Sequence, residues 1–238
     1  QASDIYVKPG ESIADAIRQA RELRRLNDPS IEGGITIHVA AGNYRIYEPL
    51  FLRPEDSGTP SSPTIIKGEG EVIVSGGVTV TGWKRQGKLM VADVPDFCGR
   101  PLDFRQFYVN GKKAVRARDV ADFEDMYRII RVDKQKRVLW VPAAAVRKIQ
   151  KAPYAEMVLH EMWCVANLRI KDIMFAGDSA AVSFHDPESR IQFEHPWPCP
   201  MVTTDGHNSA FYLTNARELL DVPGEWYHDI RAGKLYYY

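Results

Sequence analysis

The sequence of 238 residues has no net charge, because its 31 basic residues balance 31 acidic ones. Without an excess of either sign, no long-range field gathers phosphate backbones or anionic lipids. We therefore expect no nucleic-acid partner. No apolar run approaches the ~20 residues that cross a bilayer, so we expect no membrane insertion either.

Cysteine is scarce, with Cys98, Cys164 and Cys199 at wide, irregular spacings. An odd number at such spacings argues against a disulfide framework and against a zinc site. Cys164 lies in an apolar run, which predicts a buried thiol, whereas pairing of Cys98 with Cys199 stays open. Phosphate-binding loops, dinucleotide fingerprints and Ser-His-Asp signatures are also missing, so we expect no cofactor and no metal.

The first regular pattern is helical. Residues 12–26 place Ile13, Ile17, Ala20 and Leu23 on one face at spacings of three and four, with arginines opposite. This predicts an amphipathic helix with one buried side.

Short apolar runs follow, separated by Gly and Pro turns and with no helical pattern between them. They lie at residues 35–39, 50–52, 64–67 and 72–74. Their spacing is irregular and too long for two-residue hairpins, which favours stacked coils. We predict a mainly β protein in which residues 1–82 begin a right-handed parallel β-helix, with the helix capping its first coil.

After residue 82 the pattern changes to longer, alternating strands with hairpin turns. Residues 127–132 and 137–141 suit one hairpin, and residues 155–165 and 168–175 a second, turning at Ala166 and Asn167. We predict that residues 83–238 form an inserted, antiparallel, β-sandwich-like domain.

Several segments resemble one known family. They are SGT at 57–59, SP at 62–63, SGG at 75–77, QFYVNGKK at 106–113, NA at 215–216, PGEWY at 223–227 and GKLYY at 233–237. In this order they resemble parallel β-helix glycoside hydrolases of the pectate-lyase-like superfamily. The nearest type is glycoside hydrolase family 141, which includes bacterial α-L-fucosidases and xylanases acting on plant cell-wall polysaccharide.

This resemblance implies an exported glycoside hydrolase whose partner is a polysaccharide or oligosaccharide. In the family the PGEWY segment precedes many further coils, so we expect the β-helix to resume after the chain end and to carry the catalytic residues. The fragment alone is then expected to be inactive. Residues 1–4 look like a mature start left by removal of a signal peptide.

Two residues of the second predicted hairpin are candidates for substrate binding. Alternation along a strand through residue 165 would put Glu161 and Trp163 on one largely apolar face. Burial there would raise the pKa of Glu161, which suits a general acid, and an indole beside a carboxylate can hold a sugar. The structural alternative is an ion pair between Glu161 and an arginine such as Arg169 on the neighbouring strand.

His195 and Trp197 are the other candidates, in a proline-rich stretch over residues 184–200 that we expect to be an irregular loop. Such loops often reach a binding groove. Trp197 could instead be a packing anchor. His185-Asp186 and Glu194-His195 match no known metal-ligand spacing.

Three other functions compete with a hydrolase. One is a non-catalytic module that binds carbohydrate or shields the solenoid. Another is a polysaccharide lyase fragment, which would need aspartates for calcium beside a basic residue. The third is a protein–protein adaptor.

Overall fold

The computed structural model describes residues 2–238 and divides them into two compact units. The first unit is Gln1–Thr79 and the second is Val80–Tyr238. Gln1, the first residue of the expected mature start, lies outside the described residues. None of the helices in the described part is long and apolar enough to cross a membrane.

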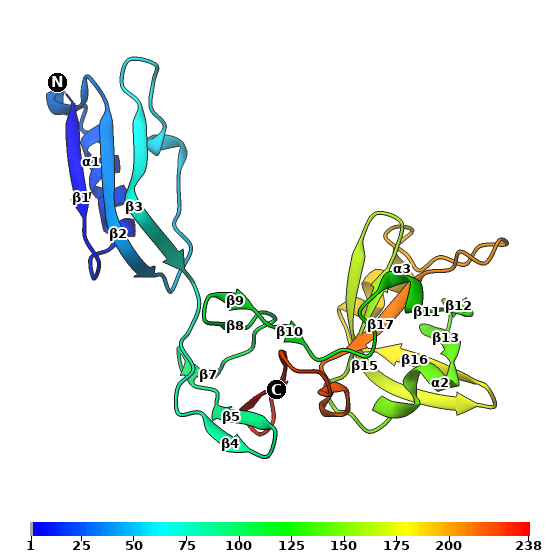
Figure 1. The fold of residues 1–238 in the computed structure, drawn as a ribbon. Coiled ribbons are helices and arrows are strands. Elements are labelled where there is room, and N and C mark those ends of the chain that lie inside the picture. Colours follow the sequence, from blue (N-terminus) through cyan, green and yellow to red (C-terminus); the bar gives the residue numbers. More distant parts are fainter. Residues whose placement is uncertain (1) are drawn as a thin grey trace. The chain divides into compact units, whose positions relative to one another are not determined.

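The first unit is a three-stranded parallel sheet covered by one helix (Figure 1). Its elements are β1 (Ser3–Val7), α1 (Ile13–Arg25), β2 (Ile35–Arg45) and β3 (Thr64–Ser75), with short 3₁₀ turns η1 (Pro29–Ile31) and η2 (Pro54–Asp56). The strands run in the order β1-β2-β3, and both pairs are parallel. Their register stacks Ile5, Ile37 and Ile66 in one row across the sheet.

Helix α1 confirms the helix predicted over residues 12–26. Ser12 is its N-cap and accepts a hydrogen bond from the amide of Asp15, which satisfies one of the free amides of the first turn. Ile13, Ala16, Ile17 and Ala20 are buried in one core with the inward residues of β1 and β2. Burial of this apolar stripe fixes the helix on one face of the sheet.

Two strand predictions in this unit were wrong. Residues 50–52 form no strand, and both Phe51 and Leu52 are exposed. The runs at 64–67 and 72–74 belong to one strand, β3, whose register with β2 shifts between Ala40 and Gly42. Gly70 in β3 has φ +90°, which lets the backbone bend there without the steric cost of a side chain.

The structure does not show the predicted parallel β-helix. The first unit has three parallel strands in one sheet, and the sheets of the second unit are mostly antiparallel. Each coil of a β-helix contributes strands to more than one sheet. Within the described residues of the first unit, β1, β2 and β3 all belong to the same sheet. The mainly β composition is confirmed.

The largest sheet of the second unit has seven antiparallel strands in the order β11-β17-β14-β15-β16-β13-β12. They are β11 (Tyr127–Arg128), β12 (Arg131–Asp133), β13 (Val138–Pro142), β14 (Glu156–His160), β15 (Val165–Ala176), β16 (Ser179–Phe184) and β17 (Ala210–Thr214). Its two edge strands, β11 and β12, are separated along the chain by Ile129 and Ile130. The sheet therefore curls until its edges meet, and the main core, with Leu139, Met157 and Leu213, packs on its inner side.

A second sheet of this unit has the order β10-β18-β19-β5-β4. Its strands are β4 (Lys84–Gln86), β5 (Leu89–Asp93), β10 (Val115–Arg116), β18 (Glu225–Asp229) and β19 (Lys234–Tyr237). The remaining strands form two small hairpins. One pairs β6 (Asp96–Phe97) with β7 (Arg100–Pro101), and the other pairs β8 (Tyr108–Val109) with β9 (Lys112–Lys113). The helices are α2 (Ala143–Val146), α3 (Glu188–Glu194), η3 (Phe123–Asp125), η4 (Arg147–Ile149) and η5 (Arg217–Leu219).

The predicted hairpins are present with different ends. β12 pairs with β13 as expected, whereas β11 leaves to pair with β17. The second hairpin joins β14 to β15, but its turn lies at residues 161–164 and not at Ala166 and Asn167. The stretch 184–200, expected to be an irregular loop, contains helix α3.

Candidate functional site

The turn between β14 and β15 carries two of the predicted site residues. β14 ends at His160, and the amide of Glu161 donates to the carbonyl of Cys164 at 2.9 Å, which closes the turn. Glu161 and Trp163 are therefore close in a turn, and the predicted shared strand face was wrong. The side chain of Trp163 is 77% exposed.

The Glu161 carboxyl group is held inside this turn. The Cys164 thiol donates to Glu161 Oε2 at 3.2 Å. Burial raises the pKa of Glu161, and burial together with the neighbouring carboxylate raises the pKa of Cys164 to about 11. Glu161 Oε1 is buried and has no hydrogen-bond partner among the described residues.

The alternative of a Glu161–Arg169 ion pair was wrong. Arg169 donates instead to Glu188, at the start of α3, and to the carbonyl of Asp186 at 2.7 Å. Among the described residues, the Cys164 thiol is the hydrogen-bond partner of the Glu161 carboxyl group. The prediction of a buried Cys164 is only partly met, since the residue is half-buried.

His160 extends this surface beyond the turn. The Phe123 ring packs edge-on against its imidazole at 5.4 Å between centroids, and Tyr212 lies at 6.2 Å. Burial lowers the pKa of His160, which favours the neutral ring at neutral pH. Its Nε2 atom is also buried without a partner in residues 2–238. Among the described residues, the strand end and the turn therefore hold two buried polar atoms without a hydrogen-bond partner, and aromatic rings pack against His160.

The other two predicted site residues lie beyond α3. His195 is the C-cap of that helix, and Trp197 is 58% exposed. No hydrogen bond or ion pair of the described residues joins either one to the turn at residues 161–164. Cys98 and Cys199 are free thiols.

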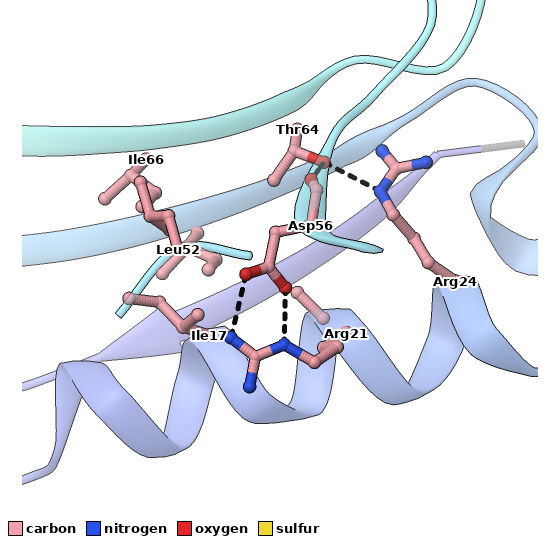
Figure 2. Close-up of a pocket in the computed structure, with 9 residues that line it drawn as sticks. Ile17, Arg21, Arg24, Leu52, Asp56, Thr64 and Ile66 are labelled. Atoms are coloured by element: carbon pink, nitrogen blue, oxygen red, sulfur yellow. Dashed lines mark hydrogen bonds and ion pairs between the residues drawn. The ribbon is translucent and has the colours of Figure 1, made fainter. Parts of the chain in front are cut away.

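In the first unit, a small cavity lies between α1 and the sheet (Figure 2). Arg21 donates to both carboxylate oxygens of Asp56, at 2.7 and 2.8 Å. Arg24 donates to the Thr64 hydroxyl at 2.7 Å, and Ile17 lies beside the pair. The free volume is about 10 Å³, room for about one water molecule. This group fastens the helix to the loop before β3 and is too small to hold a sugar.

The outer face of the parallel sheet holds a cluster that the sequence analysis missed. His38 lies between Glu69, 2.7 Å from Nδ1, and Asp4, 2.8 Å from Nε2. Tyr6 stacks on its ring at 4.8 Å. The four residues come from three strands, so their contact depends on a parallel register that local pattern does not specify. β1 itself was not predicted, because a five-residue strand pairing with a segment 32 positions away leaves little local signal.

A second missed cluster covers the outer face of β14. Glu156 is buried and accepts hydrogen bonds from Arg105 at 2.8 and 2.9 Å and from Arg116 at 2.9 Å. Arg116 also lies over the Trp226 ring, 5.4 Å from its centroid. Among residues 2–238 no group of three or more His, Cys, Asp and Glu side chains is arranged to hold a metal ion.

Comparison with known proteins identifies a family for most of the second unit. The GH141 insertion domain matches residues 87–238. The chain belongs to the GH141 insertion domain family. A solved structure with the name glycoside hydrolase is 62% identical, with a TM-score of 0.88, over 100% of this chain and 43% of that one. No curated protein matches.

The GH141 insertion domain begins between β4 and β5 and contains the whole curled sheet. The turn at residues 161–164, the Glu156 cluster and α3 therefore belong to it. The parallel sheet of the first unit lies before the matched range. The match supports a fragment of a GH141-type glycoside hydrolase.

Proposed function

We propose that this chain is part of an exported glycoside hydrolase that cleaves plant-type polysaccharide. The observation that carries the proposal is the 62% identity, over the full length of the chain, to a structure named glycoside hydrolase. The sequence resemblance to α-L-fucosidases and xylanases of family 141 supports the plant-type substrate.

We place the catalytic residues of the parent enzyme outside this chain. Glycoside hydrolysis normally uses two carboxyl groups, one as acid and one as base or nucleophile. Glu161 has a raised pKa, but its partner in the turn is a thiol. Glu156 and Asp56 are each neutralised by arginine. The chain spans 43% of the similar glycoside hydrolase, which leaves room for a catalytic pair elsewhere.

We further propose that β1, β2 and β3 are the first rungs of a parallel β-helix. The stacked row of Ile5, Ile37 and Ile66 supports this, since such rows line the interior of β-solenoids. Ile66 is 45% exposed at the free edge of the sheet and lines an apolar groove of about 390 Å³. A further rung packed there would bury that groove.

A second function, non-catalytic carbohydrate binding, is favoured by the turn between β14 and β15. Trp163 is exposed in the same turn as Glu161, whose Oε1 atom has no hydrogen-bond partner among the described residues. Aromatic faces with nearby polar groups suit a pyranose ring, whose C–H face is apolar and whose hydroxyls need partners. This binding role is compatible with a parent hydrolase.

Two assays separate these functions. The parent enzyme and the 238-residue chain are each incubated with aryl glycosides and with pectic and xylan oligosaccharides, and products are identified by mass. We expect hydrolysis by the parent and none by the chain. Hydrolysis by the chain alone would overturn the placement of the catalytic residues, and an unsaturated product would favour a lyase.

Binding is measured by retardation of the chain in polysaccharide affinity gels. Trp163→Ala should reduce retardation, while Tyr108→Ala, which removes an exposed ring from the β8–β9 hairpin, should not. Equal retardation of both variants and the unchanged chain would remove the turn as a sugar-binding surface. A stable protein partner in place of any glycan would favour the adaptor function.

A further inference from the structure

A polar cavity of about 240 Å³ lies on the curled sheet, away from the β14–β15 turn. It is formed by the β12–β13 hairpin, strand β15 and the connection from β16 to α3. Its lining includes Lys136, Arg137, Lys171, His185, Asp186 and Ser189.

The cavity has an excess of positive charge. Three of its lining residues are cationic and one, Asp186, is anionic; Glu194, which contacts Arg137, adds a second negative charge and leaves one positive charge in excess. Arg137 is paired with Asp186 at 3.7 Å and also contacts Glu194. Lys136 and Lys171 form no ion pair within residues 2–238. Two free ammonium groups at one cavity favour an anionic ligand.

A β-bulge places one of these lysines. Ile170 pairs with Phe184 and Asp172 pairs with Ser183, so Lys171 is the extra residue without a partner on β16. A bulge interrupts the ladder and redirects the side chain, and bulges are frequent beside binding sites. The hairpin turn supplies the second lysine, since the amide of Lys136 donates to Asp133 at 2.9 Å.

We propose that this cavity binds a uronic acid unit of a polysaccharide, with Lys136 and Lys171 contacting its carboxylate. This rests on the proposed function for the choice of a sugar as the anion. Asp186 in the lining supports that choice, because the hydroxyl groups of a uronate can donate hydrogen bonds to the Asp186 carboxylate. A phosphate ion at neutral pH offers few hydrogen-bond donors to the Asp186 carboxylate.

The test measures binding of trigalacturonate to the 238-residue chain by calorimetry and by amide chemical shifts. The fully methyl-esterified trisaccharide has the same sugar backbone without charge. We expect the ester to bind at least ~10-fold more weakly, since charge-assisted hydrogen bonds are about twice as strong as neutral ones. Inorganic phosphate should also bind at least ~10-fold more weakly.

The double variant Lys136→Gln/Lys171→Gln should lose at least ~10-fold in affinity for trigalacturonate. Its matched control is Lys112→Gln/Lys113→Gln, which removes the same charge from the exposed β8–β9 hairpin and should bind unchanged. Both pairs are exposed, so folding should be kept, which circular dichroism verifies.

Equal binding of acid and ester, or equal losses in both double variants, would overturn the site. If phosphate binds as tightly as trigalacturonate, the cavity binds anions in general and the proposed selectivity for a uronate is overturned. Hydrolysis by the parent enzyme is measured separately. Failure of the proposed function would therefore appear in that assay, and failure of this site in the binding assay.

Discussion

Arg21 of α1 holds the carboxylate of Asp56 with two hydrogen bonds, at 2.7 and 2.8 Å, across the side of the parallel sheet. The same carboxylate accepts from the amide of Arg53 at 2.6 Å. Asp56 is 8% exposed, so the pair is largely shielded from water. The pair fastens α1 to the loop that leads into β3. It thereby holds the helix on the face of the sheet that the helix covers.

Replacing Arg21 by Gln should destabilise the first unit, because Asp56 would stay buried without its cation. We expect a fall of roughly 5–10 °C in the melting temperature of that unit. Arg18→Gln is the control, because Arg18 pairs with Asp15 on the exposed side of α1. Circular dichroism melting curves compare the two variants, and equal effects would contradict a special role of Asp56.

The same pair sets an acid dependence. The hydrogen bonds from Arg21 lower the pKa of Asp56 below its ordinary 3.8. Stability from this group is therefore present above about pH 3.8 and is lost as the pH falls through the lower folded pKa. In the variant Asp56→Asn, the free energy of unfolding should depend less on pH in this acidic range.

His38 gives the opposite pH dependence. Its hydrogen bonds with Glu69 and then Asp4 raise its pKa above 6.5. A raised pKa means that the stabilisation is complete below about pH 6.5 and is lost as the pH rises through the folded pKa. Nuclear magnetic resonance titration of the His38 ring should show the raised value, and Asp4→Asn with Glu69→Gln should bring it back. An unchanged titration in that double variant would contradict the ion-pair assignment.

Glu156 should be the most sensitive charged residue of the curled sheet. Its loss removes the carboxylate that contacts Arg116, which is largely buried and packs against Trp226. Glu156→Ala is expected to cost about 3–5 kcal/mol in the free energy of unfolding. Arg105→Ala should cost about 1 kcal/mol or less, since Arg105 is half exposed and Arg116 still neutralises the carboxylate. Urea unfolding followed by tryptophan fluorescence measures both, and a larger loss in Arg105→Ala would contradict this ranking.

The sequence predicts the local elements well and their partners poorly. Helix α1 was predictable from its apolar spacing and from Ser12, which are properties of one short segment. The end of β14 at His160 was not predictable, because Met162, Trp163 and Val165 are residue types that are common in strands. The turn depends on contacts within residues 161–164 and on the register of β15, which alternation does not encode.

The candidate site divides in the same way. Glu161 and Trp163 were chosen as candidates by residue type, and the prediction that they share a strand face was wrong. The lysine cavity required both the bulge at Lys171 and the neighbouring hairpin, which brings together segments more than 30 positions apart. Such sites follow from tertiary register and are visible only in the folded chain.

The thiol of Cys164 offers a direct probe of the turn. Burial and the carboxylate of Glu161 raise its pKa to about 11, so little thiolate exists at mild alkaline pH. We expect iodoacetamide to alkylate the exposed Cys98 well before Cys164. Glu161→Gln removes the negative charge and should speed alkylation of Cys164, with the rate at Cys98 as the internal control. Peptide mass spectrometry over time follows both sites. Equal rates at Cys164 with and without the substitution would show that burial alone suppresses the thiolate and that Glu161 is not its effective neighbour.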